Sequence, residues 1–138
     1  MKTNALILMT LITMNFGLAQ SNTGTITVTV ENIKNNEGIV SLALHDGTTF
    51  MKSQPVMSES SKVDDGKAII TFKNVPYGEY AIIALHDENE NQRMDFDANG
   101  MPKEDYGCSN NPMFFGPPQY DESAFQLDKA EKNLSIRF

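Results

Sequence analysis

Apolar residues recur at every second position along much of this chain, and this spacing constrains the fold more than any other feature. Residues 25–30 read TITVTV, and residues 39–45 read IVSLALH. Successive side chains of a β-strand point to opposite faces, so an alternating stretch has one apolar face and one polar face. The spacing of three to four residues that marks an amphipathic helix does not recur in the same way. We therefore predict a chain built from strands.

Further strands are predicted at residues 68–72, 80–85, 125–127 and 134–138, with a short edge strand near residue 57. Clusters of Asn, Asp, Gly and Pro separate them, and Asp64-Asp65-Gly66 predicts a hairpin over residues 57–72. Short strands with turns at this spacing are typical of a sandwich. The predicted fold class is all-β, a single antiparallel β-sandwich of about seven strands with a long acidic loop.

Residues 1–19 have the pattern of a secretory signal peptide. Lys2 precedes a mostly apolar stretch, and Gly17-Leu18-Ala19 places small residues before a cleavage site near Ala19. The apolar stretch is shorter than the roughly 20 residues that span a bilayer. We predict an exported protein, periplasmic or extracellular, whose mature domain is residues 20–138 and has no transmembrane segment.

The charge balance bears on partners. The chain has 11 Lys and Arg against 18 Asp and Glu, and removal of Lys2 leaves 10 against 18, a net charge of −8. Such a surface repels phosphate backbones, so nucleic acid is not an expected partner. The single cysteine, Cys108, has no partner for an internal disulfide and is expected to be a buried, unreactive thiol.

Oxygen-bearing side chains are concentrated between His86 and Glu104. In the Ca²⁺-loop pattern D-x-[DN]-x-[DN]-G-x₅-E, ligands come from alternate positions. Three residues match the first three ligand positions, Asp87, Asn89 and Asn91, while the carbonyl of Arg93 falls at the seventh position and Asp95 at the ninth. The spacing predicts a weak Ca²⁺ site, with a dissociation constant of about 10⁻⁴ to 10⁻³ M.

Two positions depart from that pattern. Gln92 replaces the turn-forming Gly, and Ala98 replaces the closing Glu, so Asp97 or Glu104 would have to complete the shell. In the alternative without metal, these side chains bond to their own backbone and hold turns in a solvated loop. Both interpretations stay open at this point.

Four aromatic residues lie in or beside a segment rich in Gly, Pro and Asn: Tyr106, Phe114, Phe115 and Tyr120. They can form a platform that binds a sugar or a peptide. Alternatively, the rings fold back to cover a sheet edge or the open end of the sandwich, and we favour this packing role.

The segment Phe72–Ala81, FKNVPYGEYA, resembles the strand-turn-strand signature of transthyretin-like sandwich modules, which include carboxypeptidase regulatory domains and Cna-type repeats. Over residues 24–138 the chain resembles an exported bacterial family catalogued as domain of unknown function 2141. The motifs that carry this resemblance are His86-Asp87-Glu88-Asn89, residues 95–100, Pro102-Lys103-Glu104, Tyr106-Gly107, Ser109-Asn110-Asn111 and Gly116-Pro117-Pro118. The resemblance implies a fold and an export route, and little chemistry.

Departures from related modules argue against one activity and one cross-link. The chain ends in LSIRF, unlike the Tyr-Arg-Gly-Ser end of transthyretin-like hydroxyisourate hydrolases, and residues 25–30 contain no Lys for a Cna-type isopeptide bond. We expect a non-catalytic binding or structural module of the cell envelope, with an unidentified protein or carbohydrate as its partner. The alternatives are a carbohydrate- or peptide-binding module that uses the loop aromatics and, third, a small hydrolase.

Overall fold

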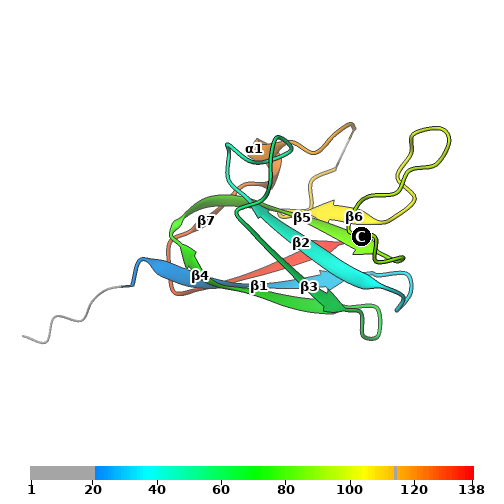
Figure 1. Ribbon diagram of the computed structural model, residues 1–138. Helices are drawn as coiled ribbons and strands as arrows, with labels where there is room; N and C mark the ends of the chain where they lie inside the picture. The colour runs from blue at the N-terminus through cyan, green and yellow to red at the C-terminus, as the bar shows by residue number, and fades with distance from the viewer. Residues whose placement is uncertain (1–20, 114) are drawn as a thin grey trace, which may run out of the picture.

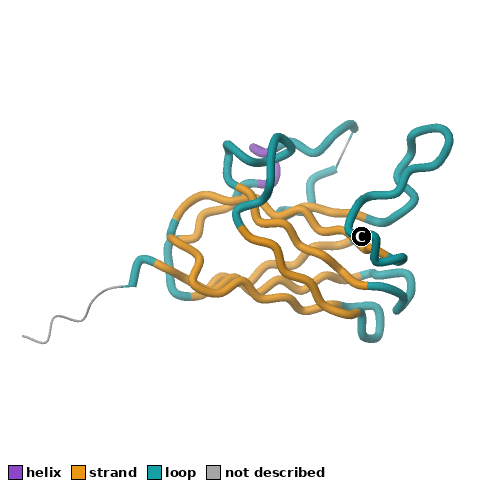
Figure 2. The backbone as a smooth tube through the Cα atoms, in the orientation of Figure 1, coloured by secondary structure: helices purple, strands orange, loops and turns teal. Residues whose placement is uncertain are grey.

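The computed structural model describes residues 21–113 and 115–138, which form two stacked β-sheets (Figure 1; Figure 2). In chain order the elements are β1 (Thr23–Glu31), β2 (Ile39–His45), β3 (Met57–Lys62), β4 (Ala68–Pro76), β5 (Gly78–Asp87), β6 (Tyr106–Cys108), α1 (Tyr120–Ser123), β7 (Phe125–Leu127) and β8 (Glu131–Arg137). The predicted signal peptide of residues 1–19 and the aromatic residue Phe114 lie outside the described residues.

The two sheets differ in size. The small sheet has the order β4-β1-β8, and the large sheet has the order β3-β2-β5-β6, with β7 paired to the first residues of β5. Strand β1 runs antiparallel to β4 and parallel to β8, whereas the pairs of the large sheet are antiparallel. This architecture confirms the predicted all-β sandwich.

The core lies between the facing sides of the two sheets. From β1 it contains Ile26, Val28 and Val30, and opposite them Leu42 and Ile82 of the large sheet are also fully or almost fully buried. Each such side chain contributes about 1.5–3 kcal/mol when it leaves water. The alternation seen in the sequence therefore identified the inward-facing residues of β1 and β2.

The hairpin predicted over residues 57–72 is wrong in one respect: its turn forms, but its strands do not pair with each other. Asp65 (φ 49°) and Gly66 (φ 72°) make the tight turn, and Asp64 and Lys67 exchange backbone hydrogen bonds of 2.8 and 3.1 Å. However, β3 pairs with β2 and β4 pairs with β1, so the chain changes sheet here. The reason is apolar content: β3 (MSESSK) stays at a solvated edge, while β4 carries buried residues into the core.

The long stretch of residues 87–123, for which no strand or helix was predicted, contains β6 and α1. Three loops stand on the outer side of the large sheet or at its end: residues 46–56, 88–105 and 109–119 (Figure 1). Among the described residues, no helix is long and apolar enough to cross a membrane.

Candidate functional site

Asp87, the last residue of β5, is buried with 0% of its surface exposed and begins the loop of residues 88–105. Its Oδ1 accepts a hydrogen bond from the backbone N–H of Asn91 at 3.1 Å, and its Oδ2 accepts one from the N–H of Gln92 at 2.7 Å. Gln92 has a left-handed backbone at φ 64°. It stands where the Ca²⁺-loop pattern has its Gly, so the turn is made without that Gly.

Three of the predicted oxygen ligands meet in this loop. The Nδ2 of Asn89 donates to Oδ2 of Asp95 at 2.6 Å, and the Nδ2 of Asn91 lies 3.0 Å from both oxygens of the same carboxylate. The Oδ1 of Asn89 accepts from the N–H of Asn91 at 3.2 Å, and the Oδ1 of Asn91 accepts from the N–H of Arg93 at 3.0 Å. We call Asn89, Asn91 and Asp95 the Asx cluster.

The buried carboxylate of Glu104 holds the two limbs of the loop together. Its Oε1 accepts from the N–H of Glu88 at 3.2 Å, and its Oε2 accepts from the N–H of Asp95 at 3.1 Å. The N–H of Lys103 also donates to the carbonyl of Asp95 at 2.8 Å. The carboxylate of Glu104 thus holds the backbone at both ends of the segment that carries the Asx cluster, at Glu88 and at Asp95.

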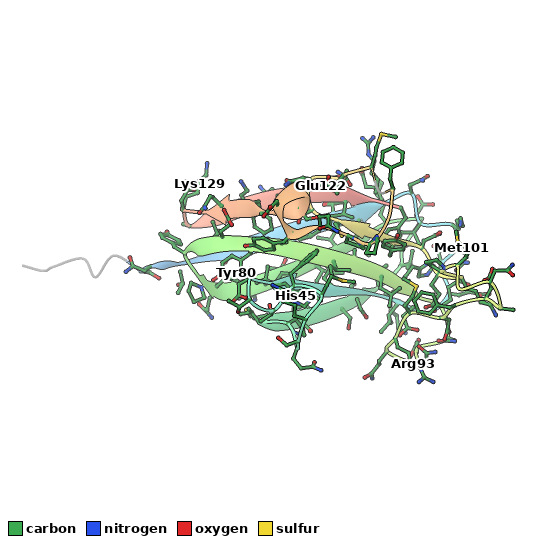
Figure 3. The ribbon with its side chains drawn as sticks, turned by 90° about the horizontal axis from the view of Figure 1, so that it is seen from above. His45, Tyr80, Arg93, Met101, Glu122 and Lys129 are labelled. Carbon is green, nitrogen blue, oxygen red and sulfur yellow. The ribbon has the colours of Figure 1, made fainter. Side chains whose placement is uncertain are left out.

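The other two predicted ligands point elsewhere. Asp97 holds a separate turn, because its Oδ1 accepts from the N–H groups of Asn99 at 2.8 Å and Met101 at 3.0 Å. Arg93 is exposed and lies at the outer edge of the loop, away from the sheets (Figure 3). The structure brings neither side chain to the Asx cluster, while the ligand predicted from Arg93, its backbone carbonyl, stays a prediction.

The donor set of the Asx cluster fits a hard cation through its amides. Rotation of an Asn amide by 180° exchanges its oxygen and nitrogen with hardly any change in shape. In that orientation Asn89 and Asn91 would turn their oxygens toward Asp95 and would give up the bonds that these oxygens accept from the N–H groups of Asn91 and Arg93. Carbonyl and carboxylate oxygens are what Ca²⁺ takes at about 2.3–2.6 Å. Among residues 21–113 and 115–138, no three His, Cys, Asp or Glu side chains are grouped to hold a metal.

The aromatic residues divide into two roles. Tyr120 packs edge-on against Phe50 with ring centroids 5.7 Å apart and donates its hydroxyl to the carbonyl of Glu79 at 3.3 Å. Burial, assisted by the nearby Glu79, raises the pKa of Tyr120 to about 12. Phe115 is 98% exposed, so the inward packing that we favoured from sequence is wrong for this ring.

Two adjoining hollows lie on the outer face of the large sheet. The first, of about 600 Å³, lies over β2 and β3, and the second, of about 770 Å³, lies over β5 and β6 and includes Tyr106 and Phe115. Ile83 and Leu85 of β5 line both hollows. The loop of the Asx cluster borders each of them, through Gln92 in the first and Met94 and Phe96 in the second.

Sequence reasoning missed Gln92, Met94 and Phe96 as site residues. They occupy every second position and alternate with Arg93 and Asp95. In the structure Asp95 belongs to the Asx cluster, while Gln92, Met94 and Phe96 border the hollows. The same rule that predicted the strands could have identified this second face.

The two histidines and the cysteine are packed into the fold. His45 lies 3.1 Å from the hydroxyl of Thr49 and packs edge-on against Phe50, and its burial lowers its pKa. His86 is fully buried, with Nε2 2.7 Å from the carbonyl of Glu37. Cys108 is 1% exposed, which confirms a buried thiol, and burial raises its pKa to about 11, which supports the prediction that it is unreactive.

Together these features define a class: a small two-sheet β-sandwich with a braced Asx-rich loop beside hollows on one outer face. The family model described as an uncharacterized protein conserved in bacteria, DUF2141, matches residues 28–135, and the chain belongs to this family. Searches of curated proteins and of solved structures gave no match. The likeness to transthyretin-like modules stays a prediction.

Proposed function

We propose that this protein is an exported, non-catalytic binding module of the cell envelope, and that Ca²⁺ orders its Asx-rich loop. The observation that carries the proposal is the convergence of Asn89 and Asn91 on the carboxylate of Asp95, at 2.6–3.0 Å. Two amides and one carboxylate carry little negative charge, so the expected affinity is that of extracellular modules, about 10⁻⁴ to 10⁻³ M. Such a site is filled where Ca²⁺ is millimolar.

The cation has a role that fits a binding module. It would hold the loop whose opposite face borders both hollows, through Gln92, Met94 and Phe96. At about 1 mM Ca²⁺ and a dissociation constant of about 10⁻⁴ M, binding would add roughly 1.4 kcal/mol to the stability of the fold. The complete burial of His86, whose Nε2 lies 2.7 Å from the carbonyl of Glu37, gives further support to a non-catalytic role, since the ring has no exposed surface that could meet a substrate.

The test compares melting temperatures in Ca²⁺ and in EDTA. Ca²⁺ should raise the melting temperature of the unmodified protein and leave that of Asp95→Asn unchanged. Asp97→Asn is the matched control: it makes the same change two residues away, at a carboxylate that serves its own turn, and should keep the response. Equal melting of the unmodified protein in Ca²⁺ and in EDTA would refute the cation proposal.

A second candidate function is ligand binding by the outer face of the large sheet. The specific observation is the pair of adjoining hollows, each within the range of about 300–1,000 Å³ that ligand sites occupy. Four exposed apolar side chains gather around the second hollow, and such a patch is the kind of feature that marks an interaction surface: Met51, Phe96, Met101 and Phe115.

A further inference from the structure

The outer face of the large sheet is more polar over β2 and β3 than over β5 and β6, and these two halves, called here the polar half and the apolar half, meet at Ile83 and Leu85. We propose that this face is a binding trough for a neutral oligosaccharide. The inference rests on the proposed binding function and names the class of ligand. It depends on three properties of the trough: unused polar groups, apolar rings, and the near absence of charge.

The polar half presents side chains that have no partner in the protein. Ser41 of β2 pairs across the sheet with Ser60 of β3, and Ser58 lies two residues along the same strand. Within the described part of the chain, the hydroxyls of these serines and the side-chain amides of Gln54 and Gln92 make no hydrogen bond to protein. Hydroxyl and amide groups can each donate and accept, as the hydroxyls of a sugar do.

The apolar half presents rings and thioethers. Phe96, Tyr106 and Phe115 border the second hollow together with Met94 and Met101. Met101 lies in the loop of residues 88–105, at the end of the molecule (Figure 3). An aromatic or methionine surface suits the C–H face of a sugar ring, and it binds without fixing the ligand to one hydrogen-bond pattern.

Charge narrows the ligand further. Charged residues make up 21% of the chain, yet Glu59 is the one charged residue that borders either hollow among the described residues. No basic group is present there to pair with a carboxylate, sulfate or phosphate. With a formal charge of −7 on the whole chain, an acidic polymer would also be repelled. A neutral ligand is the one that this lining suits.

Other occupants use only part of the trough. An extended peptide binds a sheet through the free backbone of an edge strand. The floor strand β2 is already paired on both sides, with β3 and β5, and a peptide added to the free edge of β3 would lie beside the trough and would leave the rings of the second hollow uncovered. An acyl chain would cover the rings and leave the serine hydroxyls and glutamine amides without a partner. A flat, hydroxyl-bearing ligand uses both halves at once.

The trough is held by the fold on both sides. Ser109, which follows β6, accepts a hydrogen bond from the N–H of Ile82 at 2.9 Å and donates to the carbonyl of Ser123 in α1. Asn110 donates to the carbonyl of Ala124 at 2.8 Å. These contacts tie the start of the 109–119 loop to the end of α1 and the residue that follows it, so the loop that carries Phe115 is anchored at its base.

The test is calorimetric titration of the full protein with neutral hexasaccharides of glucose (β-1,4 and α-1,4), xylose, mannose and N-acetylglucosamine at millimolar concentration. At least one should bind. Phe115→Ala should weaken that binding about tenfold or more, and the double variant of Ser58→Ala with Ser60→Ala should also weaken it. Met113→Ala is the matched control, because Met113 is 81% exposed on the same loop but borders neither hollow.

Binding of none of these sugars would overturn the inference, as would binding that Phe115→Ala and the serine variant leave unchanged. Preferential binding of oligogalacturonate, of decanoate or of a neutral peptide containing Phe and Pro would also overturn it. Titrations in Ca²⁺ and in EDTA separate the two proposals. Sugar binding without any Ca²⁺ effect on melting would refute the cation alone, and a Ca²⁺ effect without sugar binding would refute the trough alone.

Discussion

The side-chain nitrogen of Asn91 lies 3.0 Å from both carboxylate oxygens of Asp95. This contact makes Asn91 a neutral partner to a carboxylate when no cation is present. After rotation of the amide, its oxygen would face Asp95, so that both residues could act as ligands to one cation. Asn91 therefore stabilises the loop in two ways, which one substitution can separate.

Asn91→Asp should lower the melting temperature in EDTA and increase Ca²⁺ affinity. Without a cation, a second carboxylate next to Asp95 replaces an attractive contact by a repulsive one, and with Ca²⁺ the added charge becomes a ligand. Melting curves and Ca²⁺ titration measure the two effects. Asn133→Asp adds the same charge on exposed β8 and should change neither. A fall in Ca²⁺ affinity in Asn91→Asp would contradict the proposed arrangement.

Glu104→Ala should destabilise the fold by about 1–3 kcal/mol, because two N–H groups, those of Glu88 and Asp95, would lose a buried acceptor. Glu104→Gln keeps one carbonyl acceptor in the same place and should cost less. Urea denaturation of the three proteins measures the difference. If Gln and Ala cost the same, the acceptor role assigned to Glu104 is wrong.

His45 should make the protein less stable in mild acid. Burial lowers its pKa, so below about pH 6.5 the unfolded chain binds a proton that the folded chain resists, and stability is lost as the pH falls through that range. The free energy of unfolding should therefore fall between about pH 7 and pH 5, and His45→Gln should reduce this fall. An unchanged slope in the variant would show that other groups are responsible.

Cys108 should have the opposite dependence, on the alkaline side. Its folded pKa is raised from 9.0 to about 11 by burial, so its contribution is complete below about pH 9 and is lost as the pH rises toward 11. Cys108→Ala should lose less stability than the unmodified protein between about pH 8.5 and pH 10. The pKa of Tyr120 is raised as well, but this residue is present in both proteins, so its contribution cancels in the comparison. In the folded protein, Cys108 should react with Ellman's reagent only as fast as the protein unfolds.

The outcome for the strands shows what alternation can predict. Strand β2 was predicted with its observed bounds because each of its inward residues is apolar and both ends meet turn residues. The pairing of β3 was not, since MSESSK has no apolar face that selects a partner. The prediction relied on the turn residues Asp64-Asp65-Gly66, whereas the observed partner of β3 is β2, which the turn does not indicate.

The candidate site follows the same division. The ligand spacing from Asp87 to Asp95 could be read from sequence, because alternate residues of a tight loop share one side. Glu104 accepts bonds from Glu88 and Asp95, which lie 16 and 9 residues before it in the chain, and no local pattern encodes these bonds. The serines of the trough are likewise ordinary strand residues until β2 and β3 pair.

Phe115 and Phe50 should respond in opposite ways to truncation. Phe50 is 4% exposed and packs edge-on against both His45 and Tyr120, so Phe50→Ala should cost about 3–5 kcal/mol through lost burial and a cavity. Phe115 is 98% exposed, so Phe115→Ala should change the free energy of unfolding by no more than about 0.5 kcal/mol. Urea denaturation of both variants checks this. A cost of several kcal/mol at Phe115 would mean that its ring packs inward in solution, and the rim of the trough would then lack the ring on which sugar binding is proposed to depend.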